Sequence, residues 1–237
     1  MKITRRHFLT VACIACAALV LASANAQEKK APAKADPERQ ALAPIQDDPK
    51  LPRVLLIGDS ISIGYTLPVR KQLAGKANVH RIPANGGPTT NGLARLKEWL
   101  GGGTWDVIHF NWGLHDLKLM ADGQHQVSVE AYEKNLRELV GQLKATQAKL
   151  IWASTTPVPD GKLSPPRSNA DVQAYNAVAR KIMTENNVVI DDLYEFALPQ
   201  LAKIQRRVNV HFTDEGSQVL ATQVVKSIEP FLTGRGK

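Results

Sequence analysis

Ser60 and His211 are the two residues of this sequence best suited to covalent chemistry. Ser60 follows the apolar run "VLLI" and the pair Gly58-Asp59, and His211 lies in "NVHFTDEG", just before a segment with helical periodicity. A serine hydroxyl is a weak nucleophile until a base takes its proton. A histidine can accept that proton and return it to a leaving group. The pair suggests acyl transfer, although Gly, Asp and Ser are also ordinary turn residues.

Acyl transfer also needs hydrogen-bond donors for the negative oxygen that forms on the attacked carbonyl group. The loop "PANGGPTTNG" (residues 83–92) leads into a predicted helix, and its glycines would let backbone amides approach a ligand. Taken alone, this loop is better explained by a plain turn. The segment "NWGLHD" (residues 111–116) follows another predicted strand and offers polar side chains.

The elements that must position these residues alternate in type from residue 53 onward. Short β-rich runs are "RVLLIG", "NVHRIPA", "WDVIHFNW", "KLIWAST" and "VVIDD", and helical periodicity is found near residues 65–74, 90–100, 128–146, 171–185, 193–204 and 214–232. Apolar strands separated by helices predict a parallel sheet covered on both faces. We therefore expect an α/β protein, a three-layer α/β/α sandwich of about five strands. Ligands of such sheets bind beyond the carboxyl ends of the strands, where the polar residues above are found.

These residues resemble the motifs of the SGNH, or GDSL, hydrolases, a family of exported esterases and lipases with flavodoxin-like architecture. The resemblance extends from about Val54 to Leu232, and its strength lies in the order and spacing of "GDSIS" and "HFTDEG". It implies that Ser60 is the nucleophile, that His211 is the base, and that the amide of Gly87 is an oxyanion donor, with Gly86 as the alternative. The sequence contains no G-x-S-x-G elbow, which argues against the common α/β-hydrolase fold.

Two positions depart from the family pattern. "GLHD" places His115 where the family usually has an asparagine as an oxyanion donor, a role that an imidazole N–H can also fill. The aspartate that usually stands three residues before the histidine is replaced by Val208, and Asn209 is the nearest polar residue. An asparagine cannot stabilise an imidazolium as a carboxylate does. We expect a Ser-His dyad assisted by Asn209, an acid from elsewhere in the fold, or an inactive enzyme.

The N-terminal residues have the pattern of an export signal. Arg5-Arg6 precede a short apolar run, and small residues surround Ala26, so residues 1–26 are predicted to be a twin-arginine-like signal peptide cleaved near Ala26. The alternatives are a membrane anchor, for which the run is short, and a lipoprotein attached through Cys16. Residues 27–50 are rich in Ala, Pro and charge and predict a flexible linker, followed by a hydrolase domain over residues 51–237. The predicted location is periplasmic or extracellular.

The charge and cysteine content of the chain limit the classes of partner and metal that it could bind. The chain has 30 Lys and Arg against 22 Asp and Glu, and three of the basic residues lie within residues 1–26, so only a mild positive surplus remains. Because no basic stripe with interleaved aromatic residues is present, we expect no nucleic-acid partner. Cys13 and Cys16 are the only cysteines, so the mature chain would have neither disulfides nor thiolate metal sites. His109, His115 and Asp116 are too few for a zinc site. We expect no metal and no cofactor.

The predicted activity is that of an exported serine esterase. Its substrate would be a small-molecule or polysaccharide ester, with acetyl groups on a carbohydrate as the preferred case, and Trp112 could stack on a sugar ring. Two alternatives are a lipase, lysophospholipase or thioesterase on the same scaffold, and a non-catalytic glycan-binding module. The mature chain is expected to have no stable membrane span.

Overall fold

Five parallel strands form the centre of the structure, in the order β2-β1-β3-β4-β5. The structure is a computed structural model that describes residues 36–232, so the expected signal peptide and the first part of the expected linker lie outside the described residues. The strands are β1 (Arg53–Ile57), β2 (Asn78–Arg81), β3 (Val107–Phe110), β4 (Lys149–Ala153) and β5 (Val189–Asp191). The register places Val54 of β1 opposite Val79 of β2 and Val107 of β3.

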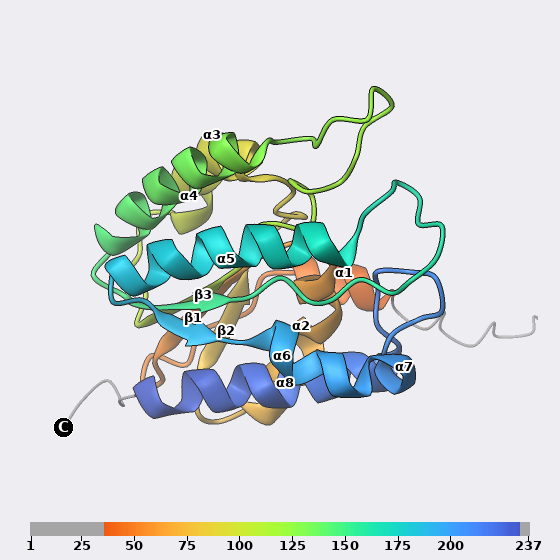
Figure 1. Ribbon diagram of the computed structural model, residues 1–237. Helices are drawn as coiled ribbons and strands as arrows, with labels where there is room; N and C mark the ends of the chain where they lie inside the picture. Colours follow the sequence, from red (N-terminus) through yellow and green to blue (C-terminus); the bar gives the residue numbers. More distant parts are fainter. Residues whose placement is uncertain (1–35, 233–237) are drawn as a thin grey trace, which may run out of the picture. The chain divides into compact units, whose positions relative to one another are not determined.

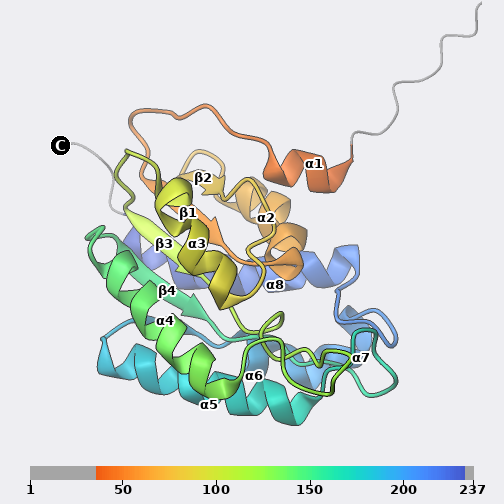
Figure 2. The ribbon, with the colours of Figure 1, turned by 90° about the horizontal axis from the view of Figure 1, so that it is seen from above.

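Helices cover both faces of this sheet. They are α1 (Pro37–Leu42), α2 (Ser60–Gln72), α3 (Thr89–Leu100), α4 (Val129–Lys144), α5 (Asn169–Glu185), α6 (Leu193–Ala197), α7 (Leu201–Ile204) and α8 (Asp214–Ile228), with 3-10 turns at Leu198–Gln200 and Glu229–Phe231. Helices α3, α4 and α5 lie above the sheet in Figure 1, and α8 lies below it. Seen from above, α3, α4 and α5 run side by side (Figure 2). The predicted three-layer α/β/α sandwich is confirmed.

The core has two halves, one on each face of the sheet, because successive side chains along a strand point to opposite faces. Leu55 and Ile57 of β1 pack with α3, α4 and α5, whereas Val54 and Leu56 pack with α2, α6 and α8. All four are essentially inaccessible to solvent. This continuous burial explains why the strands are apolar throughout their length.

Side-chain caps fix the starts of the helices nearest the polar loops. Asp59 accepts a hydrogen bond from the backbone N–H of Ile61 at 2.9 Å, so α2 begins at Ser60, five residues before its predicted start. Thr213 accepts one from the N–H of Gly216 at 2.9 Å and caps α8, which begins at Asp214, three residues after His211. Such caps satisfy amides that have no partner within the helix.

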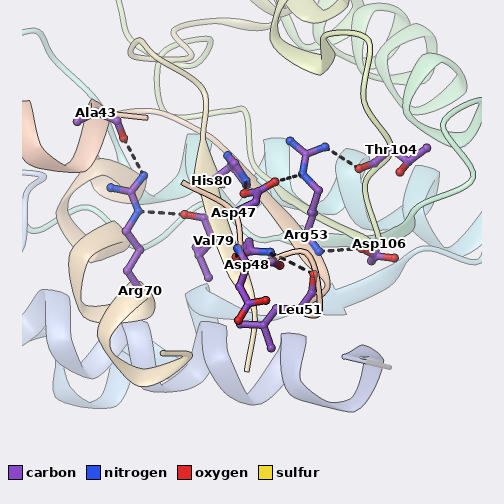
Figure 3. Close-up of polar contacts among 11 residues, drawn as sticks. Ala43, Asp47, Asp48, Leu51, Arg53, Arg70, Val79, His80, Thr104 and Asp106 are labelled. Carbon is purple, nitrogen blue, oxygen red and sulfur yellow. Dashed lines mark hydrogen bonds and ion pairs between the residues drawn. The ribbon is translucent and has the colours of Figure 1, made fainter. Parts of the chain in front are cut away.

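Residues 36–50 differ from the expected linker, because they lie on the domain (Figure 3). The guanidinium of Arg70 donates to the carbonyl oxygens of Gln40 at 3.0 Å and Ala43 at 3.2 Å, which holds the end of α1. Asn78 on β2 exchanges hydrogen bonds with the backbone of Asp48, at 2.9 and 2.8 Å. The partners of this segment are therefore remote in sequence, and local composition did not reveal them.

The described helices can be compared with the length and polarity that a membrane-spanning helix needs. Within residues 36–232, each helix is too short or too polar to cross a lipid bilayer.

Candidate active site

Ser60, His211 and Asn209 form a hydrogen-bonded chain at the carboxyl ends of the strands. His211 Nε2 lies 2.9 Å from Ser60 Oγ, and His211 Nδ1 lies 2.8 Å from Asn209 Oδ1. The same Asn209 oxygen accepts the backbone N–H of His211 at 2.9 Å. Since a backbone N–H can only donate, this atom of Asn209 must be an oxygen, and Nδ1 must carry the ring proton. His211 Nε2 therefore presents its lone pair to the Ser60 hydroxyl, the arrangement that a general base requires.

The electrostatic setting keeps His211 neutral. Burial lowers the pKa of His211, Asp59 and Glu38 raise it through space, and Arg206 and Arg167 lower it further. Within residues 36–232 the His211 ring forms no ion pair with a carboxylate, so Asn209 is its partner at Nδ1. Of the three arrangements left open by the sequence, the geometry is that of a Ser-His dyad assisted by an amide.

Val208, at the usual aspartate position, has a backbone φ of 46° and is 49% exposed. This left-handed conformation is rare for a β-branched residue. The loop bends here and brings Asn209, rather than residue 208, to the imidazole.

The two glycines considered as oxyanion donors differ in what their amides bind. The Gly86 N–H donates to the carbonyl oxygen of Gly58 at 2.9 Å, a backbone contact that joins this loop to the turn before Ser60. The Gly87 N–H donates to the side chain of Asn85 at 3.0 Å, and Asn85 borders the pocket next to Ser60. A substrate oxygen can replace this side chain more easily than a backbone carbonyl, so the geometry favours Gly87.

The backbone N–H of Ser60 is a further candidate donor, which our sequence reasoning did not consider. It belongs to the first residue of α2 and therefore has no acceptor within the helix. The amides at a helix N-terminus also carry a partial positive charge, which favours a developing oxyanion.

His115 lines the same pocket as Ser60 and His211 and is half-buried. Burial lowers the pKa of His115, against the field of Asp59 and with that of Arg167. The ring is neutral at pH 7 and has one N–H, which suits a hydrogen-bond donor.

Asp116 ties the His115 loop to the start of α3. Its Oδ1 accepts the backbone N–H of Thr89 at 2.9 Å and also accepts the Thr89 hydroxyl. Burial raises the pKa of Asp116 to about 7, against the lowering effect of these hydrogen bonds. The contact fixes the loop of Gly87 relative to the loop of His115, so these two of the three candidate oxyanion donors are held in fixed relative positions.

Arg81 holds the turn before Ser60 in place, a role that the sequence analysis did not assign to it. It stands at the end of β2, is 7% exposed, and donates through Nη2 to the carbonyl oxygens of Gly58 at 2.9 Å and Asp59 at 3.1 Å. Burial lowers the pKa of Arg81 to about 10, so it remains charged at neutral pH. The signal was present in "NVHRIPA", where an arginine interrupts a buried strand.

Two hollows meet at the Ser60–His211 pair. One, of about 320 Å³, lies against the loops of His115 and Arg167. The other, of about 440 Å³, lies between α1 and α2, and its walls include Leu67, Pro68 and Phe212. An ester carbonyl at Ser60 can therefore extend its acyl and alcohol parts into separate spaces. We call these hollows the arginine lobe and the α1 lobe.

His109, which the sequence analysis considered as a metal ligand, and Asp192, directly after the fifth strand, have structural contacts. His109 Nε2 lies 2.9 Å from Asp191 Oδ2, and both side chains are inaccessible. Asp192 accepts the N–H of Glu195 at 3.3 Å and caps α6. The described residues include no cluster of three or more His, Cys, Asp or Glu side chains that could hold a metal ion.

The idea that Trp112 stacks on a sugar was wrong. Its side chain is 1% exposed and packs in the core among Phe110 and its neighbours. Gly92 on α3 lies so close that a Cβ atom there would come within 2.8 Å of the indole. The ring fills the space between β3 and α3 and is not available to a ligand.

Comparison with solved structures finds the same fold in esterases. A lipase/acylhydrolase from Enterococcus faecalis aligns with a TM-score of 0.66 at 21% identity, covering 78% of this chain and 100% of that one. An acetyl xylan esterase aligns with a TM-score of 0.64 at 18% identity, covering 74% and 99%. The acetylxylan esterase of Geobacillus stearothermophilus gives 0.61 at 18% identity, covering 75% and 94%. A search of curated protein sequences found no significant match.

The sequence model of the GDSL-like Lipase/Acylhydrolase family matches residues 56–219, which is most of the described domain. The match includes Ser60, Gly87, His115 and His211. The protein is a carboxylic-ester hydrolase that belongs to the GDSL-like lipase/acylhydrolase family.

Proposed function

We propose that this protein is an exported serine esterase that removes small acyl groups, acetyl in the simplest case, from carbohydrate esters. The observation that carries the catalytic part is the 2.9 Å contact between Ser60 Oγ and the unprotonated Nε2 of His211. The sugar substrate is supported by the acetylxylan esterases among the similar folds. Export is supported by the twin-arginine-like pattern of residues 1–26, which would place the enzyme in the periplasm or outside the cell.

In the proposed reaction, Ser60 Oγ attacks the ester carbonyl carbon as His211 Nε2 takes its proton. The amides of Ser60 and Gly87 and the N–H of His115 stabilise the oxyanion. Collapse of the intermediate breaks the bond to the alcohol, which leaves with the proton from Nε2. Water then enters, gives a proton to His211 and attacks the acyl-Ser60 ester. The second collapse releases the acid and returns the proton to Ser60, so the step needs no cofactor.

One observation favours a second candidate, a lipase or lysophospholipase. Apolar side chains line much of the α1 lobe, among them Ile63, Leu67 and Phe212, and a longer acyl chain could lie along them. A short-chain esterase would instead leave this lobe to the alcohol.

Turnover of p-nitrophenyl esters of increasing chain length, from acetate to decanoate, tests both candidates. The proposal predicts the highest kcat/KM for acetate, release of acetate from acetylated xylooligosaccharides, and loss of both in Ser60→Ala. A maximum at eight or more carbons would favour the lipase. Absence of turnover for every ester, in a folded protein, would contradict both and favour a non-catalytic glycan-binding module.

A further inference from the structure

Among the described residues that line the arginine lobe, Arg167 is the only one with a full charge. The other side chains there are neutral, and they include Ser60, Asn85, His115 and His211. No Asp or Glu belongs to this lining within the part of the chain that the structure describes. A substrate group that enters the lobe therefore meets one fixed positive charge close to the reacting atoms.

Two backbone hydrogen bonds orient the guanidinium of Arg167. Its Nε donates to the carbonyl oxygen of Leu114 at 2.8 Å, and its Nη1 donates to that of Pro165 at 3.3 Å. Within residues 36–232 it forms no ion pair, in contrast to Arg53, Arg95, Arg137 and Arg180, whose carboxylate partners lie within 4 Å. Neutral carbonyl groups thus hold the guanidinium in place. The Nη2 atom of Arg167 has no hydrogen-bond partner among the described residues.

The electrostatics of the lobe agree with this arrangement. Burial lowers the pKa of Arg167, and the field of Asp59 opposes that change. Arg167 in turn contributes to the lowered pKa values of His115 and His211. Its field therefore reaches both imidazoles. A half-buried arginine without an anion has lost part of its hydration. A carboxylate would replace the lost water contacts with a planar, charge-assisted pair of hydrogen bonds.

We propose that Arg167 determines substrate specificity by binding a carboxylate group carried by the ester, so that the preferred substrates are anionic esters. This inference rests on the proposed function, since it assigns a substrate class to the same site. An acetylated sugar acid would be both a carbohydrate ester and a carrier of the carboxylate. The contact to Leu114, next to His115, means that Arg167 also supports the oxyanion loop, so the test must separate charge recognition from that structural effect.

Two matched pairs of esters make this separation. In the first pair the alcohol carries the charge: 4-acetoxybenzoate is compared with its neutral analogue 4-acetoxybenzamide. In the second the acyl part carries it: the p-nitrophenyl monoester of adipic acid is compared with the p-nitrophenyl ester of adipamic acid. The measured quantity is the ratio of kcat/KM for the anionic ester to that for its neutral partner. Structural damage to the His115 loop lowers both values and cancels from the ratio.

In at least one pair, we expect the wild-type ratio to exceed 1, and Arg167→Gln to lower it about tenfold or more, as expected for loss of a hydrogen bond between charged groups. The pair that responds identifies the side of the ester that enters the arginine lobe. Arg167→Lys keeps the charge and should give a ratio between those of wild type and Arg167→Gln. Arg206→Gln is the matched control, because Arg206 also donates to a backbone carbonyl, that of Phe212 at 3.1 Å, but lines the α1 lobe. In the pair that responds to Arg167→Gln, the ratio for Arg206→Gln should equal that of wild type.

Several results would overturn the inference. If the wild type cleaves the neutral esters and Arg167→Gln leaves both ratios unchanged, Arg167 has a structural role only and the proposed esterase function stands. An equal loss of ratio in Arg206→Gln, in the same pair of esters, would show a general effect of positive charge and would also contradict a specific contact. If the wild type cleaves none of the four esters, the inference and the proposed function fail together.

Discussion

Asn209 and His211 make two contacts through one oxygen atom. Asn209 Oδ1 accepts the Nδ1–H of His211 at 2.8 Å and its backbone N–H at 2.9 Å. The orientation that a catalytic aspartate usually gives to a histidine is here provided by a neutral group. The ring is oriented, but within residues 36–232 no carboxylate is in hydrogen-bond contact with the imidazolium that forms during attack.

Replacing Asn209 with aspartate should supply this charge. We expect Asn209→Asp to raise kcat or leave it unchanged and to raise the pKa of His211, because a charge-assisted hydrogen bond is about twice as strong as a neutral one. Kinetics on a short-chain ester and titration of the His211 ring by NMR measure the two effects. Asn209→Ala, which removes the acceptor, is the control and should lower kcat. A clear fall in kcat for a well-folded Asn209→Asp would contradict the amide-assisted dyad.

The wild-type pH profile follows from the same ring. His211 acts as a base only when neutral, so kcat/KM should fall as the pH drops through its pKa. Burial lowers that pKa, and therefore the acid limb should lie below about pH 6.5, the usual value for a histidine. Initial rates from about pH 4.5 to pH 8 locate the limb, and Asn209→Asp should move it to higher pH. A wild-type midpoint clearly above pH 7 would show that a carboxylate contacts His211 and would contradict the amide partner at Nδ1.

His115 is expected to stabilise the oxyanion as a neutral N–H donor. His115→Ala should lower kcat by roughly 10² to 10³, the usual loss for one such donor, with little change in KM. His115→Asn, which restores the amide usual in the family, should recover most of the rate. If the loss in His115→Ala is instead confined to KM, His115 binds the ground state of the substrate and is not an oxyanion donor.

The sequence predicted the sheet and the catalytic pair because both depend on local patterns. Apolar runs marked all five strands, and the residues after them marked Ser60 and His211. The start of α2 was predicted too late, since "SISIG" contains β-branched residues and a glycine, and the packing of α2 against α8 outweighs these weak preferences. The order of the strands in space and the two hollows depend on tertiary packing, which periodicity does not encode.

Some contributors to the site could not have been found from the sequence. Arg167 stands in the Ser- and Pro-rich loop "SPPRS", where an isolated arginine resembles any surface charge. Helix α1 arises in an Ala- and Pro-rich stretch, and its place beside the site depends on Arg70, which lies about 30 residues further along the chain. In both cases the functional meaning comes from contacts between segments that are distant in sequence.

The buried pair of His109 and Asp191 should be a major determinant of stability. Besides His109, the Asp191 carboxylate accepts hydrogen bonds from Gln223 at 2.9 Å and Ser227 at 3.2 Å. Asp191→Ala should lower the free energy of unfolding by about 3–5 kcal/mol, because it leaves buried polar groups without partners. Glu133→Ala, which removes an exposed partner of Arg137, is the control and should cost about 0–1 kcal/mol. Urea denaturation measures both, and equal small losses would contradict this role of Asp191.

The nucleophile is tested most directly by covalent trapping with a serine-directed fluorophosphonate, followed by mass spectrometry of the digested protein. We predict one adduct, on the peptide that contains Ser60, formed at a rate that His211→Ala lowers by about 10² or more. Ester hydrolysis should be lost in proportion to the adduct formed, and Ser60→Ala should give no adduct. An adduct on another residue, or full ester hydrolysis by Ser60→Ala, would contradict the assignment of Ser60 as the nucleophile.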